Sequence, residues 1–274
     1  GINWKALVVL NGKQVGRIEG AFMRGQFDIT DYLQEGDNEL LVYVQNNDNP
    51  GARKTKTGEN TSFNGGVLGG DNPTFHATIG WDWITTIPGR EVGIWNDVFL
   101  TATEAVTISD PLVNTTLADG KATMTPSVFV KNHLSTPVQG TLRGNIGDIC
   151  FEKEVILGAN TETEIVFSPE EYRQLAGQHM KLWWPNGYGK PHMYHAAYIF
   201  HSPQTKSVAR MEYRTGIRQV TYKDETTRLQ LYINGQRFIP LGGNWGFSEN
   251  HLNYRGREYD IAVGYHRQMN CTMI

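Results

Sequence analysis

The stretch from Gly80 to Leu100 carries the residue types best suited to chemistry in this chain. It opens with Gly-Trp-Asp-Trp and closes with Gly-Ile-Trp-Asn-Asp-Val-Phe-Leu. In an extended strand, the rings of Trp81 and Trp83 would lie on one face and the carboxylate of Asp82 on the other. In a loop all three side chains can converge, and stacking surfaces beside a carboxylate suit a sugar ring with its hydroxyls. The alternative, favoured by composition alone, is a buried tryptophan pair that anchors a β-sandwich.

Composition excludes several classes of protein. The 274 residues allow one large domain or two to three ordinary ones. A net charge of -3 offers no basic field to attract nucleic acid. No run of about 18 apolar residues is present, so we expect no membrane-spanning helix and no membrane partner. Cys150 and Cys271 fall in segments that we assign to different domains, which argues against a disulfide and against a sulfur metal site.

Thirty glycines and twelve tyrosines indicate β structure with many turns. Near the N-terminus the pattern predicts strands at 3–10, 15–18 and 39–44, the first two joined by a hairpin turn at Asn11-Gly12. The polar, glycine-rich stretch 46–70 is expected to be a long loop. Regularly spaced strands typical of a sandwich are then predicted at 122–130, 138–146, 152–157, 162–167, 194–200 and 207–213.

The last segment has a different pattern. A hairpin at 229–239 is expected to run into an apolar strand that reaches Asn244. A helix is predicted over 257–270, where Ile261, Tyr265 and Met269 recur every four residues. Residues 271–274 are expected to begin a second buried strand. Strand, helix and strand in this order open a βα series, so we expect the sequence to be cut at both ends.

Four stretches resemble the family 2 glycoside hydrolases: Val9–Lys13 with Phe27–Leu33, Gly80–Trp83 with Gly93–Val98, Tyr213–Arg218, and Ile233–Gln236 with Leu241–Trp245. The resemblance implies a mainly β chain in three parts. Residues 1–104 would form a jelly-roll sugar-binding domain that lacks its N-terminal part. Residues 105–218 would form an immunoglobulin-like β-sandwich, and residues 219–274 the first βα unit of a (β/α)8 TIM barrel.

The same resemblance implies the activity. The parent protein would be a retaining exo-β-glycosidase that hydrolyses terminal β-linked sugars, closer to the β-mannosidase and exo-β-glucosaminidase branches than to the β-galactosidases. Both catalytic glutamates would lie beyond Ile274, so no catalytic residue is assigned and the fragment is expected to be inactive. The alternative is a stand-alone carbohydrate-binding or scaffold protein without hydrolase activity.

Substrate-binding residues are also implied by the resemblance. Asp82 matches the position from which the first domain reaches the terminal sugar, with Trp81 or Trp83 stacking beside it. Asn244 and Trp245 would end the first barrel strand and face the pocket. Weaker candidates follow in the next loop: Glu249, Asn250 and His251.

Further expectations concern partners and packing. No histidine pair shows a metal-ligand spacing, so neither a metal nor another cofactor is expected. Trp183-Trp184-Pro185-Asn186-Gly187 is expected to pack against neighbouring domains; an exposed stacking platform for a longer glycan is the alternative. We expect a carbohydrate partner, leave a homo-oligomer open, and favour a periplasmic or extracellular location by analogy with the family.

Overall fold

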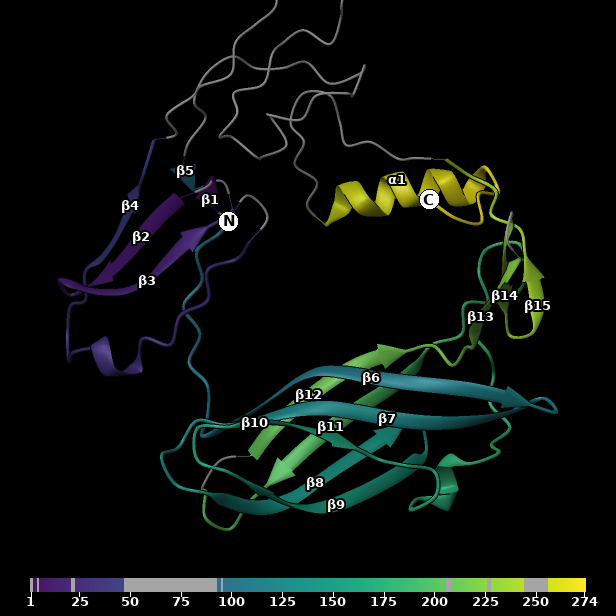
Figure 1. Cartoon of the computed structure of the whole chain (residues 1–274), viewed down its shortest axis with the longest axis horizontal. Helices are drawn as coiled ribbons and strands as arrows, with labels where there is room; N and C mark the ends of the chain where they lie inside the picture. Colours follow the sequence, from purple (N-terminus) through teal and green to yellow (C-terminus); the bar gives the residue numbers. More distant parts are fainter. Residues whose placement is uncertain are drawn as a thin grey trace, which may run out of the picture. The chain divides into compact units, whose positions relative to one another are not determined.

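The computed structural model describes residues 2–3, 5–20, 23–46, 93–94, 96–205, 208–225, 228–243 and 256–274. These residues are mainly in β-strands, with a single α-helix among them (Figure 1). The predicted mainly β class is therefore confirmed. The chain divides into two compact units, one made of 1–100 with 246–257 and the other of 101–245 with 258–274. The domain boundaries at 104 and 218 stay predictions.

The first unit contains an antiparallel sheet with the strand order β3-β2-β4: β2 (Lys5–Leu10), β3 (Lys13–Glu19) and β4 (Leu40–Val44). The predicted hairpin is present, with Asn11 and Gly12 at φ 51 and 76 as a two-residue turn requires. Alternate side chains of β2 are buried, which is the period-2 pattern of a strand with one covered face. The Asn11 side chain also donates to Tyr32 O and accepts from Glu39 N, so it ties the hairpin to the stretch before β4.

Two shorter elements complete the described part of this unit. β1 (Ile2–Asn3) pairs antiparallel with β5 (Gly93–Ile94). A 3-10 turn, η1 (Thr30–Tyr32), begins where Asp28 Oδ1 accepts a hydrogen bond from the Thr30 N–H at 3.0 Å. The long loop predicted at 46–70 lies, except for Asn46, outside the described residues.

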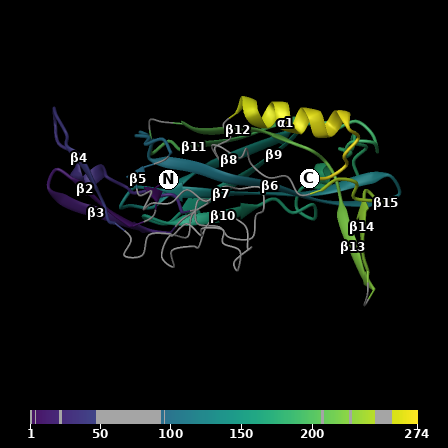
Figure 2. The same cartoon turned by 90° about the horizontal axis from the view of Figure 1, so that it is seen from above.

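The second unit holds a β-sandwich of two antiparallel sheets (Figures 1 and 2). One sheet has the order β10-β7-β6: β6 (Val106–Ala118), β7 (Lys121–Asn132) and β10 (Glu162–Val166). The other has the order β12-β11-β8-β9: β8 (Val138–Ile146), β9 (Ile149–Leu157), β11 (Tyr194–His201) and β12 (Val208–Thr215). Six of these strands coincide with the predicted ones.

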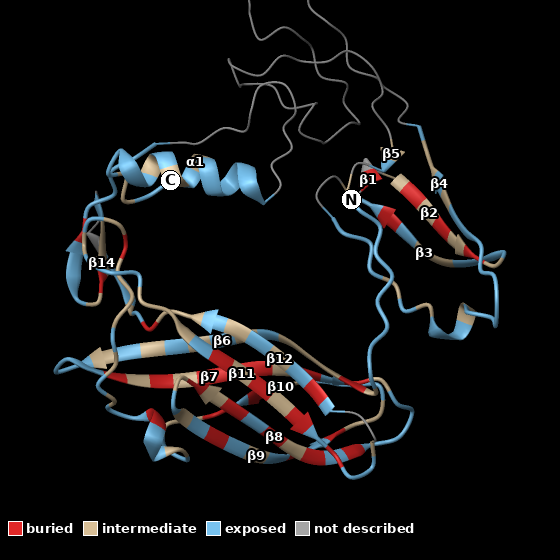
Figure 3. Ribbon diagram, turned by 180° about the vertical axis from the view of Figure 1, so that it is seen from behind, coloured by how far each residue is buried: buried red, intermediate tan, exposed pale blue. Residues whose placement is uncertain are grey.

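The core of the sandwich lies between the sheets, where the buried residues of β7, β8 and β11 gather (Figure 3). Phe151, Phe167 and Tyr198 form an aromatic cluster inside it, with the rings of Phe151 and Phe167 centred 4.6 Å apart. Burial of this apolar surface is the main force that holds the two sheets together.

The C-terminal segment forms a small sheet, β13 (Val220–Glu225), β14 (Arg228–Ile233) and β15 (Gln236–Phe238), followed by α1 (Arg257–Gln268). The predicted hairpin is confirmed, with Asn234 and Gly235 at φ 52 and 78. The predicted helix is confirmed as well. None of the helices described is both long and apolar enough to cross a lipid bilayer.

Two expectations for this segment are wrong. Residues 239–243 form no strand within the described range, and residues 271–274 form neither a strand nor a buried segment, since Met273 and Ile274 are half exposed. A strand needs a repeating ladder of hydrogen bonds, whereas here the backbone bonds converge on one carbonyl, that of Leu241. The start of a barrel therefore stays a prediction.

Candidate functional site

The five residues predicted to contact sugar, Trp81, Asp82, Trp83, Asn244 and Trp245, lie outside the described residues. The weaker candidates Glu249, Asn250 and His251 do so too. Residues 239–243, which precede Asn244, belong to the described part of the chain, and their hydrogen bonds show how this segment is held.

Thr272 holds the backbone that leads to Asn244. The Leu241 N–H donates to Thr272 Oγ1 at 2.8 Å, and the Thr272 N–H donates to Leu241 O at 2.8 Å. The Thr272 hydroxyl donates to Ile239 O at 3.0 Å. A Cβ on Gly242 would lie 1.9 Å from Met273 O, so only glycine permits this approach. The two segments that flank α1 therefore lie side by side.

The tryptophan-rich insert packs within its own unit. Trp183 is half-buried, its N–H donates to Ile217 O at 2.8 Å, and the Arg218 guanidinium lies 4.7 Å from its ring centre. Asn234 Nδ2 donates to Trp183 O at 2.9 Å. Trp183 therefore packs against residues that follow the sandwich, and one face of its ring is covered by Arg218. Packing of the insert between domains stays a prediction.

A groove of about 400 Å³ lies over β8, β9 and β11. Arg143, Asn145 and Glu152 contribute polar groups, and Ile199 contributes apolar surface. Arg143 Nε is 2.9 Å from Glu152 Oε2, and both side chains are largely exposed. Retaining hydrolysis uses two carboxyl groups about 5–5.5 Å apart. This groove offers one carboxylate, already paired with arginine, so it does not fit that chemistry.

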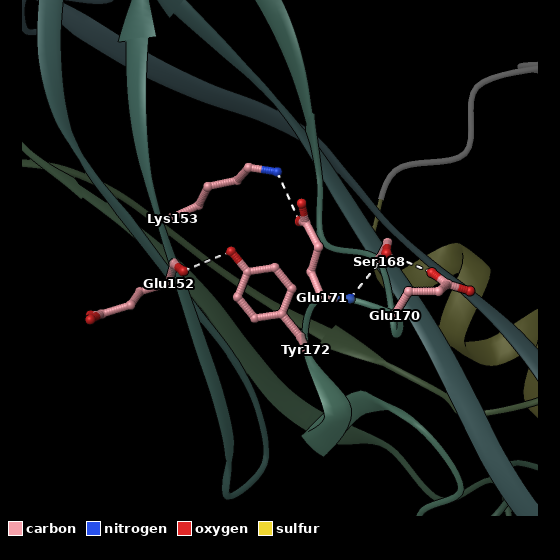
Figure 4. Close-up of polar contacts among 6 residues, drawn as sticks. All are labelled: Glu152, Lys153, Ser168, Glu170, Glu171 and Tyr172. Carbon is pink, nitrogen blue, oxygen red and sulfur yellow. Dashed lines mark hydrogen bonds and ion pairs between the residues drawn. The ribbon is translucent and has the colours of Figure 1, made fainter.

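Two neighbouring glutamates, Glu170 and Glu171, lie on the surface beside β9, the edge strand of its sheet (Figure 4). The Ser168 hydroxyl donates to Glu170 Oε2 at 2.5 Å, which holds the pKa of Glu170 below its usual value. Glu171 instead pairs with Lys153 at 3.2 Å. The two carboxylates therefore have separate hydrogen-bond and ion-pair partners on the surface.

Tyr172, in the same view, has a structural role. Its hydroxyl donates to Glu152 O at 2.9 Å, and burial raises its pKa. Gln174 donates to Cys150 O at 3.1 Å. Since β9 is an edge strand, these bonds occupy two of its outward carbonyl groups and protect the edge.

Among the residues that the structure describes, no group of three or more His, Cys, Asp or Glu side chains could hold a metal ion. Cys150 and Cys271 are both free. The absence of a cofactor stays a prediction, as does the sugar site itself.

Within the described residues, the sheet β3-β2-β4 is followed by a β-sandwich of two antiparallel sheets, and this order is typical of two consecutive β domains. Residues 1–96 match the family model described as glycosyl hydrolase 2 galactose-binding domain-like, and residues 106–218 match the model for glycosyl hydrolases family 2. The chain belongs to glycoside hydrolase family 2.

Sequence similarity to known proteins extends beyond the residues matched by these two family models. The chain is 30% identical over 283 residues to a mannosylglycoprotein endo-β-mannosidase of Lilium longiflorum, which covers 100% of this chain and 29% of the relative. It is 26% identical over 258 residues to an exo-β-D-glucosaminidase of Streptomyces avermitilis, covering 91% of this chain and 26% of the relative. The chain thus spans less than a third of either relative.

Solved structures have the same fold. An exo-chitosanase of Amycolatopsis orientalis aligns with a TM-score of 0.72 at 24% identity, covering 97% of this chain and 28% of that one. A β-D-mannosidase of Dictyoglomus thermophilum aligns with a TM-score of 0.68 at 20% identity, covering 99% of this chain and 33% of that one.

Proposed function

We propose that this chain is the N-terminal, non-catalytic portion of a retaining exo-β-glycosidase that hydrolyses terminal β-linked sugars. The observation that carries the proposal is the similarity of nearly the whole chain to a mannosidase and to glucosaminidases, across both family 2 domains and the segment after them. The same similarity favours the β-mannosidase and exo-β-glucosaminidase branches.

The chain's role in this proposal is binding. Asp82 accepts hydrogen bonds from hydroxyls of the terminal sugar, which are stronger than neutral hydrogen bonds because the acceptor is charged. Trp81 or Trp83 stacks on the sugar ring, and Asn244 and Trp245 contribute from the segment after Gly243. The nucleophile and the acid/base, both glutamates, belong to residues beyond Ile274.

Two alternative functions are tested alongside this proposal. The lily relative is named an endo-β-mannosidase, which favours a protein that cleaves within a glycan. A stand-alone carbohydrate-binding or scaffold protein is the other alternative, and it would need no catalytic glutamates.

The test compares this chain with a longer protein that carries the residues after Ile274. Nitrophenyl β-glycosides of mannose, glucosamine and galactose are offered to both. We expect no nitrophenol release by the 274-residue chain and release by the longer protein, fastest with mannose or glucosamine. Turnover by this chain alone would contradict the proposal. An endo-acting enzyme would leave these monosaccharide substrates intact and cleave only longer glycans.

Location and assembly belong to the proposal too. We place the parent protein in the periplasm or outside the cell, which fractionation of the source organism tests. Association of identical chains is tested by light scattering of the longer protein.

A further inference from the structure

Helix α1 is not held in place by apolar burial. None of its residues is buried, and its ribbon carries only the colours for exposed and intermediate residues (Figure 3). The apolar residues Ile261, Val263 and Tyr265 are 47%, 45% and 63% exposed. Helices in proteins usually gain most of their stability from a packed apolar face. Polar contacts, in contrast, gather at its C-terminal end.

The helix ends in a Schellman motif. Asn270 has φ 62, its N–H donates to Arg267 O at 3.1 Å, and the Cys271 N–H donates to His266 O at 3.0 Å. The last carbonyl groups of a helix carry a partial negative charge and need donors. The motif supplies two of these donors from the chain itself.

A third donor group comes from the sandwich insert. Asn186 Nδ2 donates to Arg267 O at 3.0 Å and to Cys271 O at 3.0 Å, across 81 and 85 residues of sequence. One uncharged amide thus uses both of its hydrogens on carbonyl groups at the end of the helix. A carboxylate in the same place would face those carbonyls with charge of the same sign.

The insert is shaped to present this amide. Pro185 is buried, and the Tyr188 N–H donates to Pro185 O at 3.1 Å, which closes a tight turn. Gly187 has φ +81, a conformation that favours glycine. The Tyr188 hydroxyl accepts from the Ile239 N–H at 2.8 Å, so the same turn also holds the segment on the other side of α1.

We propose that Asn186 is a positioning residue, the centre of a carboxamide latch that fixes residues 239–242 and the C-terminal end of α1 on the insert of the sandwich. The latch consists of Asn186, Tyr188 and Thr272. Asn186 holds Cys271, its neighbour Thr272 holds Leu241, and Tyr188 holds Ile239. The latch consequently fixes the backbone up to Gly242, and its effect on sugar binding rests on the proposed function.

The latch is tested first without sugar, by hydrogen exchange of the 274-residue chain followed by mass spectrometry. Asn186→Asp keeps the shape of the side chain but removes both donors. Amides in 265–274 should then exchange about tenfold faster, since about 1.4 kcal/mol corresponds to a factor of ten. Asn186→Gln keeps the donors on a longer side chain and should restore part of the protection.

The matched control is Asn145→Asp. Asn145 Nδ2 donates to Gly147 O at 3.0 Å within the β8–β9 hairpin, away from the latch. This variant should leave exchange in 265–274 unchanged, and peptides of β7 and β8 report that the sandwich stays folded in every variant. Unchanged exchange in 265–274 of Asn186→Asp would overturn the latch.

The consequence for sugar binding is measured in the longer protein. Asn186→Asp should raise KM for the preferred nitrophenyl glycoside about tenfold while kcat changes less, because the latch positions binding residues. If kcat and KM both stay at wild-type values while exchange quickens, the positioning role is wrong. Loss of hydrolysis in the wild-type protein would instead count against the proposed function, so the two failures are distinguishable.

Discussion

The sandwich and the C-terminal segment of the second unit bury their apolar side chains to very different degrees. Between β6 and β12 a continuous core fills the space between two sheets, and Phe167 and Leu142 within it are fully buried. From β13 to Ile274, the described apolar residues that are buried are Ile233 and Phe238, while α1 buries none. The sandwich is therefore held by its apolar core, whereas the proposed latch holds the other region through hydrogen bonds to the 182–189 insert.

The largest expected effect tests the core directly. Phe167→Ala should lower the free energy of unfolding by about 3–5 kcal/mol, because it removes a fully buried ring and leaves a cavity. Ile261→Ala on exposed α1 should cost less than about 0.5 kcal/mol. Urea unfolding followed by tryptophan fluorescence measures both. Equal losses of unfolding free energy in the two variants would show that the core of the sandwich and the exposed helix do not differ in this way.

A buried polar group provides the next test. Asn132 is fully buried; its Nδ2 donates to Thr136 O at 2.8 Å and Gly158 O at 2.9 Å, and its Oδ1 accepts from the Leu134 N–H. Asn132→Ala would leave these groups without their partner, at a cost of about 2–4 kcal/mol in urea unfolding. Exposed Asn114 on β6 is the matched control, and its replacement by alanine should be nearly neutral. If Asn132→Ala left the free energy of unfolding unchanged, the backbone groups that Asn132 bonds would have found other hydrogen-bond partners.

Alkaline pH should weaken the sandwich through a buried phenol. The pKa of Tyr198 is raised above its ordinary value of 10.0. Burial of the phenol is the largest cause, and the neighbouring Tyr213 adds to it. The folded state therefore holds this proton where the unfolded chain releases it. Its contribution is complete below pH of about 10 and is lost as pH rises further, by up to about 1.4 kcal/mol per pH unit. In Tyr198→Phe the fall of the urea midpoint between pH 10 and 11 should be shallower; an unchanged slope would contradict this account.

The smallest expected effect concerns the edge of β9. Tyr172→Phe removes the hydrogen bond to Glu152 O and should cost about 0.5–1.5 kcal/mol. Lys153→Ala breaks an exposed ion pair with Glu171 and should cost less, under about 1 kcal/mol. Urea midpoints measure both changes, and hydrogen exchange of β9 shows where they act. A larger loss in Lys153→Ala would mean that the ion pair, rather than the tyrosine, protects the edge.

Strands with one buried face were predictable because their side chains alternate. In β8 buried and more exposed residues alternate along its whole length, and the prediction matches its bounds. β6 was missed, since a bulge between Ser109 and Leu112 shifts its register and Leu112 points outward. β13 was missed because its second half, Lys223-Asp224-Glu225, consists of charged residues that are uncommon in strands, and its pairing with β14 supplies the order that its own pattern lacks.

The candidate site was predictable only as residue types. Asp82 between two tryptophans suggested a sugar contact, and that prediction remains to be tested. The role of Asn186 was missed. The Pro-Asn-Gly order does signal a turn, but the acceptors of its amide lie more than eighty residues further along the chain.

The mainly β class, the positions of most sandwich strands, both Asn-Gly hairpins and the helix before Asn270 could be predicted from local sequence patterns. These features follow from periods of 2 and 3.6 residues and from turn chemistry, which act between near neighbours. Three further features depend on tertiary contacts: Ile261 on α1 is exposed, residues 271–274 form no strand, and Asn186 donates to carbonyl groups at the helix end. Burial and hydrogen-bond partners depend on segments distant in sequence, and no local pattern records which of them meet.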